Sequence, residues 1–101
     1  MMQKSKTAKQ MERHFKGIGN HYRIEILLLV ESSPGITVWN IADALRANRK
    51  TISQHTRYLV YAGLVNKRYK GRNVEHALSL YGKVVSRFIK SFKAIPRRLP
   101  E

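Results

Sequence analysis

Residues 46–65, RANRKTISQHTRYLVYAGLV, combine side chains that bind polyanions with the spacing of a packed helix. Four of them are positively charged and none is acidic: Arg46, Arg49, Lys50 and Arg57. An arginine can bind the O6 and N7 atoms of guanine in a fork, and a glutamine can pair with the N6 and N7 atoms of adenine. The stretch therefore indicates either a surface that binds a polyanion or a solvated exterior.

Helical geometry separates the two faces of this stretch. The spacing predicts a helix over 49–61 with four residues turned inward: Ile52, His55, Thr56 and Leu59. The outer positions are then Arg49, Lys50, Ser53, Gln54 and Arg57, with Thr51 and Tyr58 on the flanks, where they could contact phosphate. The spacing of His55 favours a packed, hydrogen-bonded histidine over a base reader.

The charge of the whole chain favours the polyanion reading. Its 101 residues include 20 Lys+Arg and 6 Asp+Glu, for a formal charge of +14. The partners that suit this charge are nucleic acid, an anionic membrane surface or an acidic protein. From Arg46 to Arg72 there are eight Lys/Arg and no acid, whereas a surface selected only for solubility usually mixes signs. We expect double-stranded nucleic acid to be the partner.

Composition argues against most other classes of protein. The chain has no cysteine, which excludes disulfides, thiolate metal ligands and cysteine nucleophiles. Its longest apolar run is 26–30, far below the roughly 20 residues that span a bilayer, and it has no signal-peptide pattern. We therefore expect a soluble intracellular protein that is not associated with a membrane.

Catalytic and metal-binding patterns are missing from the sequence. The six acids form no obvious carboxylate pair, and no serine or histidine lies in a nucleophile motif or beside a Gly-rich phosphate loop. We predict no enzyme, no catalytic residue, no cofactor and no small-molecule effector. The four histidines lack metal-ligand spacing, so we predict no metal. One alternative stays open, a site that bridges two subunits through His14 and His21.

The elements that must position the cationic face follow from periodicity and caps. We expect one domain over 1–101, with a first helix from about Lys6 to Lys16 and a second one capped by Asn20. A helix-turn-helix follows over 37–62, with Thr37 and Asn48 as its caps. A hairpin over 64–80 turns at KGRN, and a last helix covers 80–93. The predicted class is mainly α with a small β-hairpin, a winged helix-turn-helix of about five helices.

Residues 15–80 resemble the ArsR-type winged helix-turn-helix transcription regulators. The likeness lies in FKGIGNHYRIEILLLV, in TISQH and AGLV of the two-helix segment, and in KRYKGRNVEHALSL of the wing. Three residues depart from the pattern. Arg46 stands where glycine is frequent, Ala47 where a large aliphatic residue is usual, and Thr56 where leucine is usual. A tight turn at 46 often needs a left-handed backbone, which arginine adopts less readily than glycine.

The resemblance implies that the helix over 49–61 enters the major groove, and the hairpin that follows it carries further cations. The basic residues of the hairpin and the turn are Arg46, Lys67, Arg68, Lys70 and Arg72. Strand alternation sends the hairpin cations to opposite faces of the sheet. Lys70 and Arg72 at the tip are therefore the best placed for phosphate or the minor groove. The alternative is a charged hairpin that merely prevents edge pairing.

Apolar stripes on the terminal segments 7–18 and 80–93 predict a homodimer. They hold more apolar surface than one subunit can bury: Met11, Phe15, Ile18, Tyr81, Val84, Val85, Phe88 and Phe92. The resemblance implies that these helices pair across a two-fold axis. Trp39, the only tryptophan of the chain, fits either an exposed interface or partial burial in the core.

The most specific function that the sequence supports is a sequence-specific DNA-binding transcription regulator. We expect a homodimeric repressor that reads a palindromic site. The first alternative is an architectural, chromatin-like protein that coats DNA without reading bases. The second is a winged helix that binds RNA or protein, because fold alone does not fix function.

Overall fold

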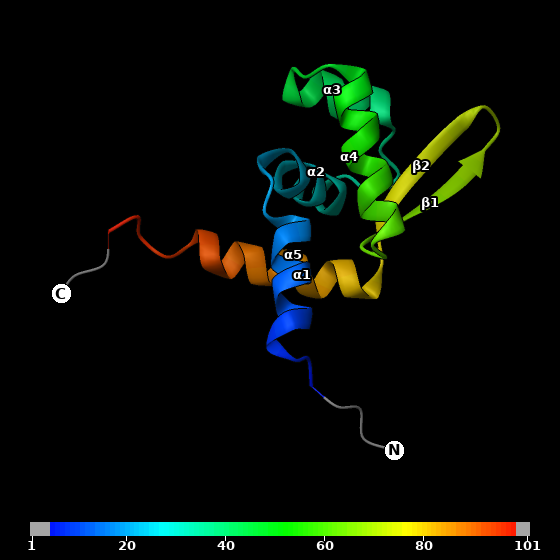
Figure 1. The fold of residues 1–101 in the computed structure, drawn as a ribbon. Helices are drawn as coiled ribbons and strands as arrows, with labels where there is room; N and C mark the ends of the chain where they lie inside the picture. Colours follow the sequence, from blue (N-terminus) through cyan, green and yellow to red (C-terminus); the bar gives the residue numbers. More distant parts are fainter. Residues whose placement is uncertain (1–4, 99–101) are drawn as a thin grey trace.

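The computed structural model describes residues 5–98, which form five helices and one antiparallel hairpin (Figure 1). In chain order they are α1 Ala8–Ile18, α2 His21–Ser32, α3 Val38–Leu45, α4 Arg49–Tyr61, β1 Val65–Lys70, β2 Asn73–Leu78 and α5 Leu80–Lys93. This order confirms the predicted winged helix-turn-helix fold. In Figure 1 the hairpin projects away from the helices, and α1 crosses α5 at the opposite end of the molecule from α3.

Side-chain caps set the beginning of each helix. The predicted caps Asn20, Thr37 and Asn48 each accept hydrogen bonds from backbone N–H groups of the first turn. The prediction for α1 was wrong by two residues at both ends. Thr7 forms a capping box with Gln10, which delays the helix to Ala8, and the helix continues through Gly17 to Ile18.

Helix α2 is the centre of the core. Three of its residues are fully buried, Ile26, Leu27 and Val30, because α3, α4, α5 and β2 all pack around it. Ile24 and Leu28 of the same helix are only partly covered. A helix surrounded on several sides has no single apolar stripe, so periodicity ranks its residues poorly.

Helices α3 and α4 each bury one side, and α4 buries three of the four residues that its spacing turned inward. Ile41 and Ala42 of α3 are buried, as are Ile52, Thr56 and Leu59 of α4. The core is completed by Leu64, Val65 and Leu78 at the base of the hairpin. The helix-turn-helix is therefore fixed to the rest of the domain along its whole inner side.

Helix α5 approaches the base of the hairpin closely. A Cβ atom on Gly82 would lie 1.9 Å from the carbonyl oxygen of Leu64, so only glycine fits this contact. Further along the helix, Lys90 forms an ion pair with Glu31 of α2. This hydrogen-bonded partner lowers the pKa of the Glu31 carboxyl. Both contacts attach α5 to the rest of the domain.

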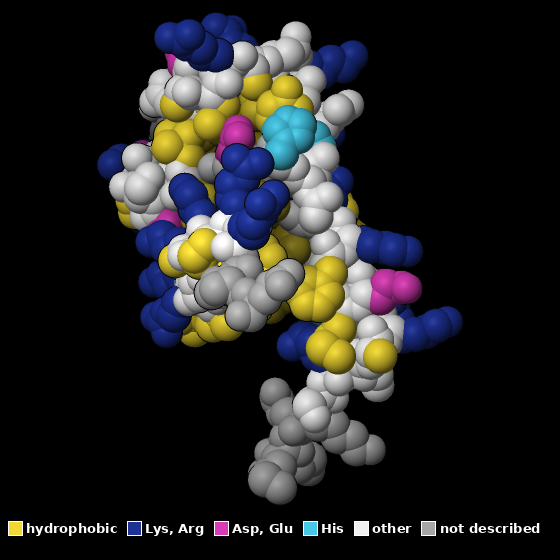
Figure 2. All heavy atoms as spheres, turned by 90° about the vertical axis from the view of Figure 1, so that its left-hand side faces the viewer, with side chains coloured by type: hydrophobic (Ala, Val, Ile, Leu, Met, Phe, Trp, Pro, Cys, Tyr) yellow, Lys and Arg dark blue, Asp and Glu magenta, His cyan; other side chains and the backbone are white. Residues whose placement is uncertain are grey.

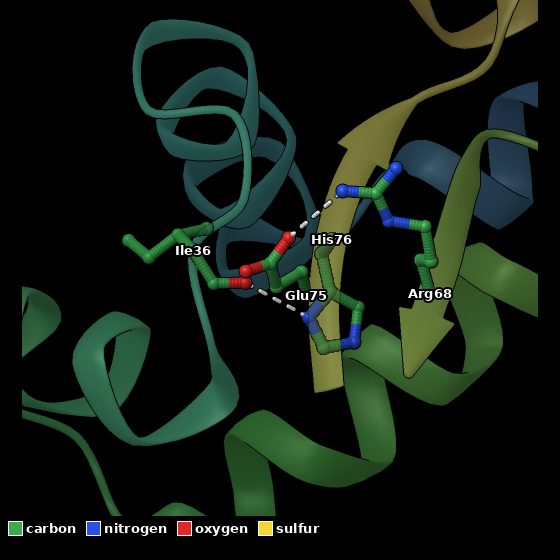
Figure 3. Close-up of polar contacts among 4 residues, drawn as sticks. All are labelled: Ile36, Arg68, Glu75 and His76. Atoms are coloured by element: carbon green, nitrogen blue, oxygen red, sulfur yellow. Dashed lines mark hydrogen bonds and ion pairs between the residues drawn. The ribbon is translucent and has the colours of Figure 1, made fainter. Parts of the chain in front are cut away.

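The hairpin is anchored to the segment that precedes α3. β1 and β2 pair antiparallel from Val65 opposite Leu78 to Lys70 opposite Asn73. The buried ring of His76 makes a hydrogen bond from Nδ1 to the carbonyl oxygen of Ile36 over 3.0 Å, and the two backbones form an isolated bridge (Figure 3). His76 thus has a structural role, and the base of the wing has a fixed position relative to α3.

Candidate nucleic-acid interface

The turn between α3 and α4 has a left-handed backbone at Arg46, the position where the sequence departs from the glycine that is frequent in the resembling family. Arg46 has φ 52° and ψ 45°, and it is the only residue other than glycine with positive φ in the part of the chain that the structure describes. Asn48 then accepts hydrogen bonds from the backbone N–H groups of Lys50 and Thr51. The first turn of α4 is thereby held in a defined direction.

The outer face of α4 carries the predicted cations. Arg49, Lys50, Gln54 and Arg57 are exposed, and Thr51 and Ser53 are half-buried beside them. Between Ser5 and Arg98 there are two ion pairs, Arg68–Glu75 and Lys90–Glu31, so no cation of α4 has a carboxylate partner among these residues. The face therefore offers positive charge that is not neutralised within the described chain.

The inner flank of α4 contains a polar and aromatic cluster. His55 lies there, as predicted, with its ring against Tyr22 at a centroid distance of 5.5 Å and Nδ1 accepting a hydrogen bond from Arg23. Arg23 also donates to the carbonyl oxygen of Gly17 and lies 3.7 Å above the ring of Tyr58. Sequence reasoning missed Arg23 as the centre of this cluster, since its three contacts come from other elements.

Tyr58 does not lie on the outer face with the cations. Its ring is covered by Arg23, and a Cβ atom on Gly17 would lie 2.7 Å from its hydroxyl. Its hydroxyl thus lies beside α1 while the residue keeps 36% of its surface exposed, and its contact with phosphate stays a prediction.

The hairpin carries its cations on two faces and at its tip. The register places Lys67 opposite the buried His76, and Arg68 opposite Glu75 on the other face. An Nη atom of Arg68 lies 3.6 Å from a carboxylate oxygen of Glu75 (Figure 3), so part of its charge is offset within the hairpin. Lys70 and Arg72 are exposed at the turn, where the sequence analysis expected the best contacts.

Trp39 is exposed and lies next to the cationic face. It retains 60% of its accessible surface, and the guanidinium carbon of Arg49 lies 3.5 Å from the centroid of its ring. Of the two alternatives for this residue, exposure is the one observed. Helical spacing already indicated this, because Trp39 lies outside the inward stripe of α3, in which Ile41 and Ala42 are buried and Val38 and Leu45 partly covered.

The terminal helices carry an exposed apolar surface. Met11, Phe15, Val84, Phe88 and Phe92 are exposed, whereas Ile18, Tyr81 and Val85 pack against the core of their own subunit. Leu80 and Ile95 are also exposed and were absent from the predicted set. In Figure 2 hydrophobic side chains gather around the end of α5 and lie among Lys and Arg.

The remaining histidines form no metal site in the described residues. Across 5–98 no three His, Cys, Asp or Glu side chains lie close enough together to hold an ion. His14 makes a hydrogen bond with the hydroxyl of Tyr81, and His21 packs against Tyr22. None of the described helices has both the length and the apolar character needed to cross a membrane.

Comparison with known proteins agrees with this geometry. Residues 20–67 match the family described as "Bacterial regulatory protein, arsR family". No curated protein matches the chain.

Solved structures share the fold at low sequence identity. HlyU from Vibrio cholerae is 22% identical with a TM-score of 0.76, over 91% of this chain and all of that one. The homodimeric winged helix-turn-helix DNA-binding domain of a possible ArsR-family transcriptional regulator from Mycobacterium bovis is 24% identical, with a TM-score of 0.69 and 99% coverage of both chains. FabT from Streptococcus pneumoniae, solved in complex with DNA, is 15% identical with a TM-score of 0.68, over 82% of this chain and 64% of that one.

Proposed function

We propose that this chain, whose residues 20–67 match the arsR family of bacterial regulatory proteins, is a sequence-specific regulator of transcription that binds double-stranded DNA. Helix α4 enters the major groove and the tip of the hairpin contacts the adjacent backbone. Arg49, Gln54 and Arg57 read base edges, and Lys50, Lys70 and Arg72 bind phosphate. Repression follows from occlusion of the promoter.

The observation that carries this proposal is the outer face of α4. Arg49, Lys50 and Arg57 are exposed and have no carboxylate partner in residues 5–98, on a helix whose inner side is buried through Ile52 and Leu59. A rigid helix with free arginine and glutamine side chains can place donors at fixed points in a groove. A merely solvated face would carry compensating acids.

The proposed active form is a homodimer that reads a palindrome. Exposed apolar residues of α1 and α5, among them Phe15 and Phe88, support association of two copies through this surface. A two-fold dimer presents its two α4 helices to half-sites one turn of DNA apart, about 34 Å. With three to five phosphates bound per subunit, affinity falls roughly 10³- to 10⁵-fold between 50 and 200 mM salt.

Selection of bound fragments from random duplex DNA, followed by competition with unrelated duplex, tests the proposal. We expect one enriched sequence with two-fold symmetry. The triple variant Arg49→Ala, Gln54→Ala, Arg57→Ala should lose the preference. The double variant Lys83→Ala, Lys93→Ala also removes two positive charges, from exposed positions of α5, and should keep the preference.

A second candidate is an architectural protein that coats DNA. The net charge of +14 favours it, because non-specific affinity depends mainly on charge. Equal binding to all duplexes would support this candidate and exclude the regulator. Unchanged duplex binding by the triple variant would instead exclude α4 as the contact surface.

A further inference from the structure

We propose that Trp39 is a positioning residue that holds the guanidinium of Arg49 ready for a bidentate contact with a base edge, and so contributes to sequence discrimination. This inference rests on the proposed function and extends it to a residue outside α4. It assigns a role to the only tryptophan of the chain.

The two side chains meet because of the turn between α3 and α4. Trp39 is the second residue of α3 and Arg49 the first residue of α4. The left-handed Arg46 and the cap Asn48 fix the direction in which α4 leaves the turn. With this geometry the guanidinium carbon lies 3.5 Å from the centroid of the indole ring.

Packing of the core does not explain Trp39. The inner side of α3 consists of the buried Ile41 and Ala42, with Val38 and Leu45 partly covered. Trp39 keeps 60% of its surface exposed, and the cation–π contact with Arg49 is the aromatic interaction that the structure gives it within residues 5–98. The exposed face of this ring is therefore available to hold the guanidinium of Arg49.

The contact restrains Arg49 and leaves its donors free. The N–H groups of a guanidinium lie in its plane, whereas an aromatic ring covers its face. The side chain of Arg49 makes no hydrogen bond or ion pair with another described residue. The side chain of Arg49 therefore loses fewer rotamers when the complex forms, and the N–H groups of its guanidinium stay free to bind a base. Such pre-organisation lowers the entropic cost of binding.

The position of the ring fits a contact surface that includes the wing. Trp39 and Asn40 of α3 line one side of a surface hollow of about 480 Å³, and Arg72 and Asn73 at the tip of the hairpin line the other side. Trp39 therefore lies between Arg49 and the wing tip. Lys50, the next cation of α4, has no aromatic partner in the described residues, so the restraint is specific to Arg49.

A double-mutant cycle on the selected duplex tests whether Trp39 acts through Arg49. Trp39→Leu should weaken binding to the selected sequence by about two- to fivefold, as expected for an exposed cation–π contact, and change binding to random duplex less. In the Arg49→Ala background the same change should have no further effect. Trp39→Phe keeps an aromatic face and should restore most of the discrimination.

A matched control and a spectroscopic readout complete the experiment. Tyr61→Ala removes an aromatic that is 91% exposed at the other end of α4, and it should leave discrimination unchanged. Because Trp39 is the only tryptophan, its emission in the free protein reports the contact directly and should shift in Arg49→Leu.

Three results would overturn the inference. Equal losses from Trp39→Leu with and without Arg49 would show that the ring acts independently of it. Identical emission of the wild type and Arg49→Leu would show that the contact is absent in solution. A wild-type chain without any sequence preference would overturn the proposed function itself, and with it the role of Trp39.

Discussion

The side chain of Arg23 joins α2 to α4 through His55: the Nε–H of Arg23 donates a hydrogen bond to Nδ1 of His55 over 3.2 Å. The same guanidinium donates to the carbonyl oxygen of Gly17 over 2.7 Å and covers the ring of Tyr58. One cation thus connects α1, α2 and α4 on the inner flank of α4. Because Nδ1 of His55 is the acceptor, the bond requires the neutral imidazole.

This arrangement predicts that acid destabilises the domain through His55. Burial, then the charge of Arg23, then His21, lowers the pKa of the His55 imidazole from its ordinary value of 6.5. Below that value the unfolded chain binds a proton that the folded chain resists, so the free energy of unfolding falls as the pH decreases from 6.5 toward the folded pKa. Urea unfolding of the wild type at pH 7.5 and at about pH 5 measures the difference.

His55→Gln is the control for this pH dependence. Its amide oxygen can accept the hydrogen bond from Arg23 and does not titrate. We expect a smaller loss of stability in acid for this variant than for the wild type. Equal losses would assign the effect to other groups.

Thr56→Val should stabilise the domain. Thr56 is buried at 2% exposure, and its hydroxyl oxygen has no hydrogen-bond partner in the structure. Valine keeps the shape of the side chain and removes the buried polar atom. This should raise the free energy of unfolding by about 1 kcal/mol. Urea unfolding checks this value, and Thr51→Val, at a half-buried position of the same helix, should change stability little. A loss of stability in Thr56→Val would indicate a partner for the hydroxyl.

Gly82→Ala should destabilise the domain although alanine favours helices. The gain in helix propensity is at most about 1 kcal/mol. The added Cβ would lie 1.9 Å from the backbone oxygen of Leu64, which cannot rotate away. Overpacking of this kind typically costs about 1–3 kcal/mol, so the net effect is unfavourable. Thermal unfolding should show a lower Tm than for Lys83→Ala next to it, and an unchanged Tm would mean that α5 moves easily away from the hairpin.

Phe88→Asp should separate the proposed dimer. Phe88 is 51% exposed and lies 6.4 Å, between ring centroids, from both Phe15 and Phe92. A carboxylate at the centre of this surface would have to be desolvated on association. Sedimentation equilibrium should find a monomer for this variant and a dimer for Tyr61→Asp. A dimer that survives Phe88→Asp would place the interface elsewhere.

The sequence was sufficient wherever local signals determine the structure. Asn48 and the spacing of Ile52 and Leu59 predicted α4 with the bounds that the structure has. The capping box of Thr7 and Gln10 is an equally local signal. It begins α1 at Ala8, two residues after the start that apolar spacing predicted.

Contacts between elements could not be predicted from spacing. The pairing of Trp39 with Arg49, and of Arg23 with His55, depends on the angles at which α2, α3 and α4 cross. Periodicity assigns a residue to a face of its own helix and says nothing about the neighbour it meets. The outward cations of α4 were therefore predictable, and the contact of Arg49 with Trp39 was not.

Arg46 allows the geometry of the turn to be separated from its charge. A residue with a Cβ atom is less stable than glycine by about 1 kcal/mol in the left-handed conformation that Arg46 adopts. Arg46→Gly should therefore be more stable than Arg46→Ala by that amount in urea unfolding. Both variants lose the same positive charge. If Arg46 contacts phosphate, both should bind the selected duplex more weakly and with a shallower salt dependence, by the same factor. Equal stability of the two variants would show that the turn is not left-handed in solution, and unequal binding would assign the effect to the direction of α4.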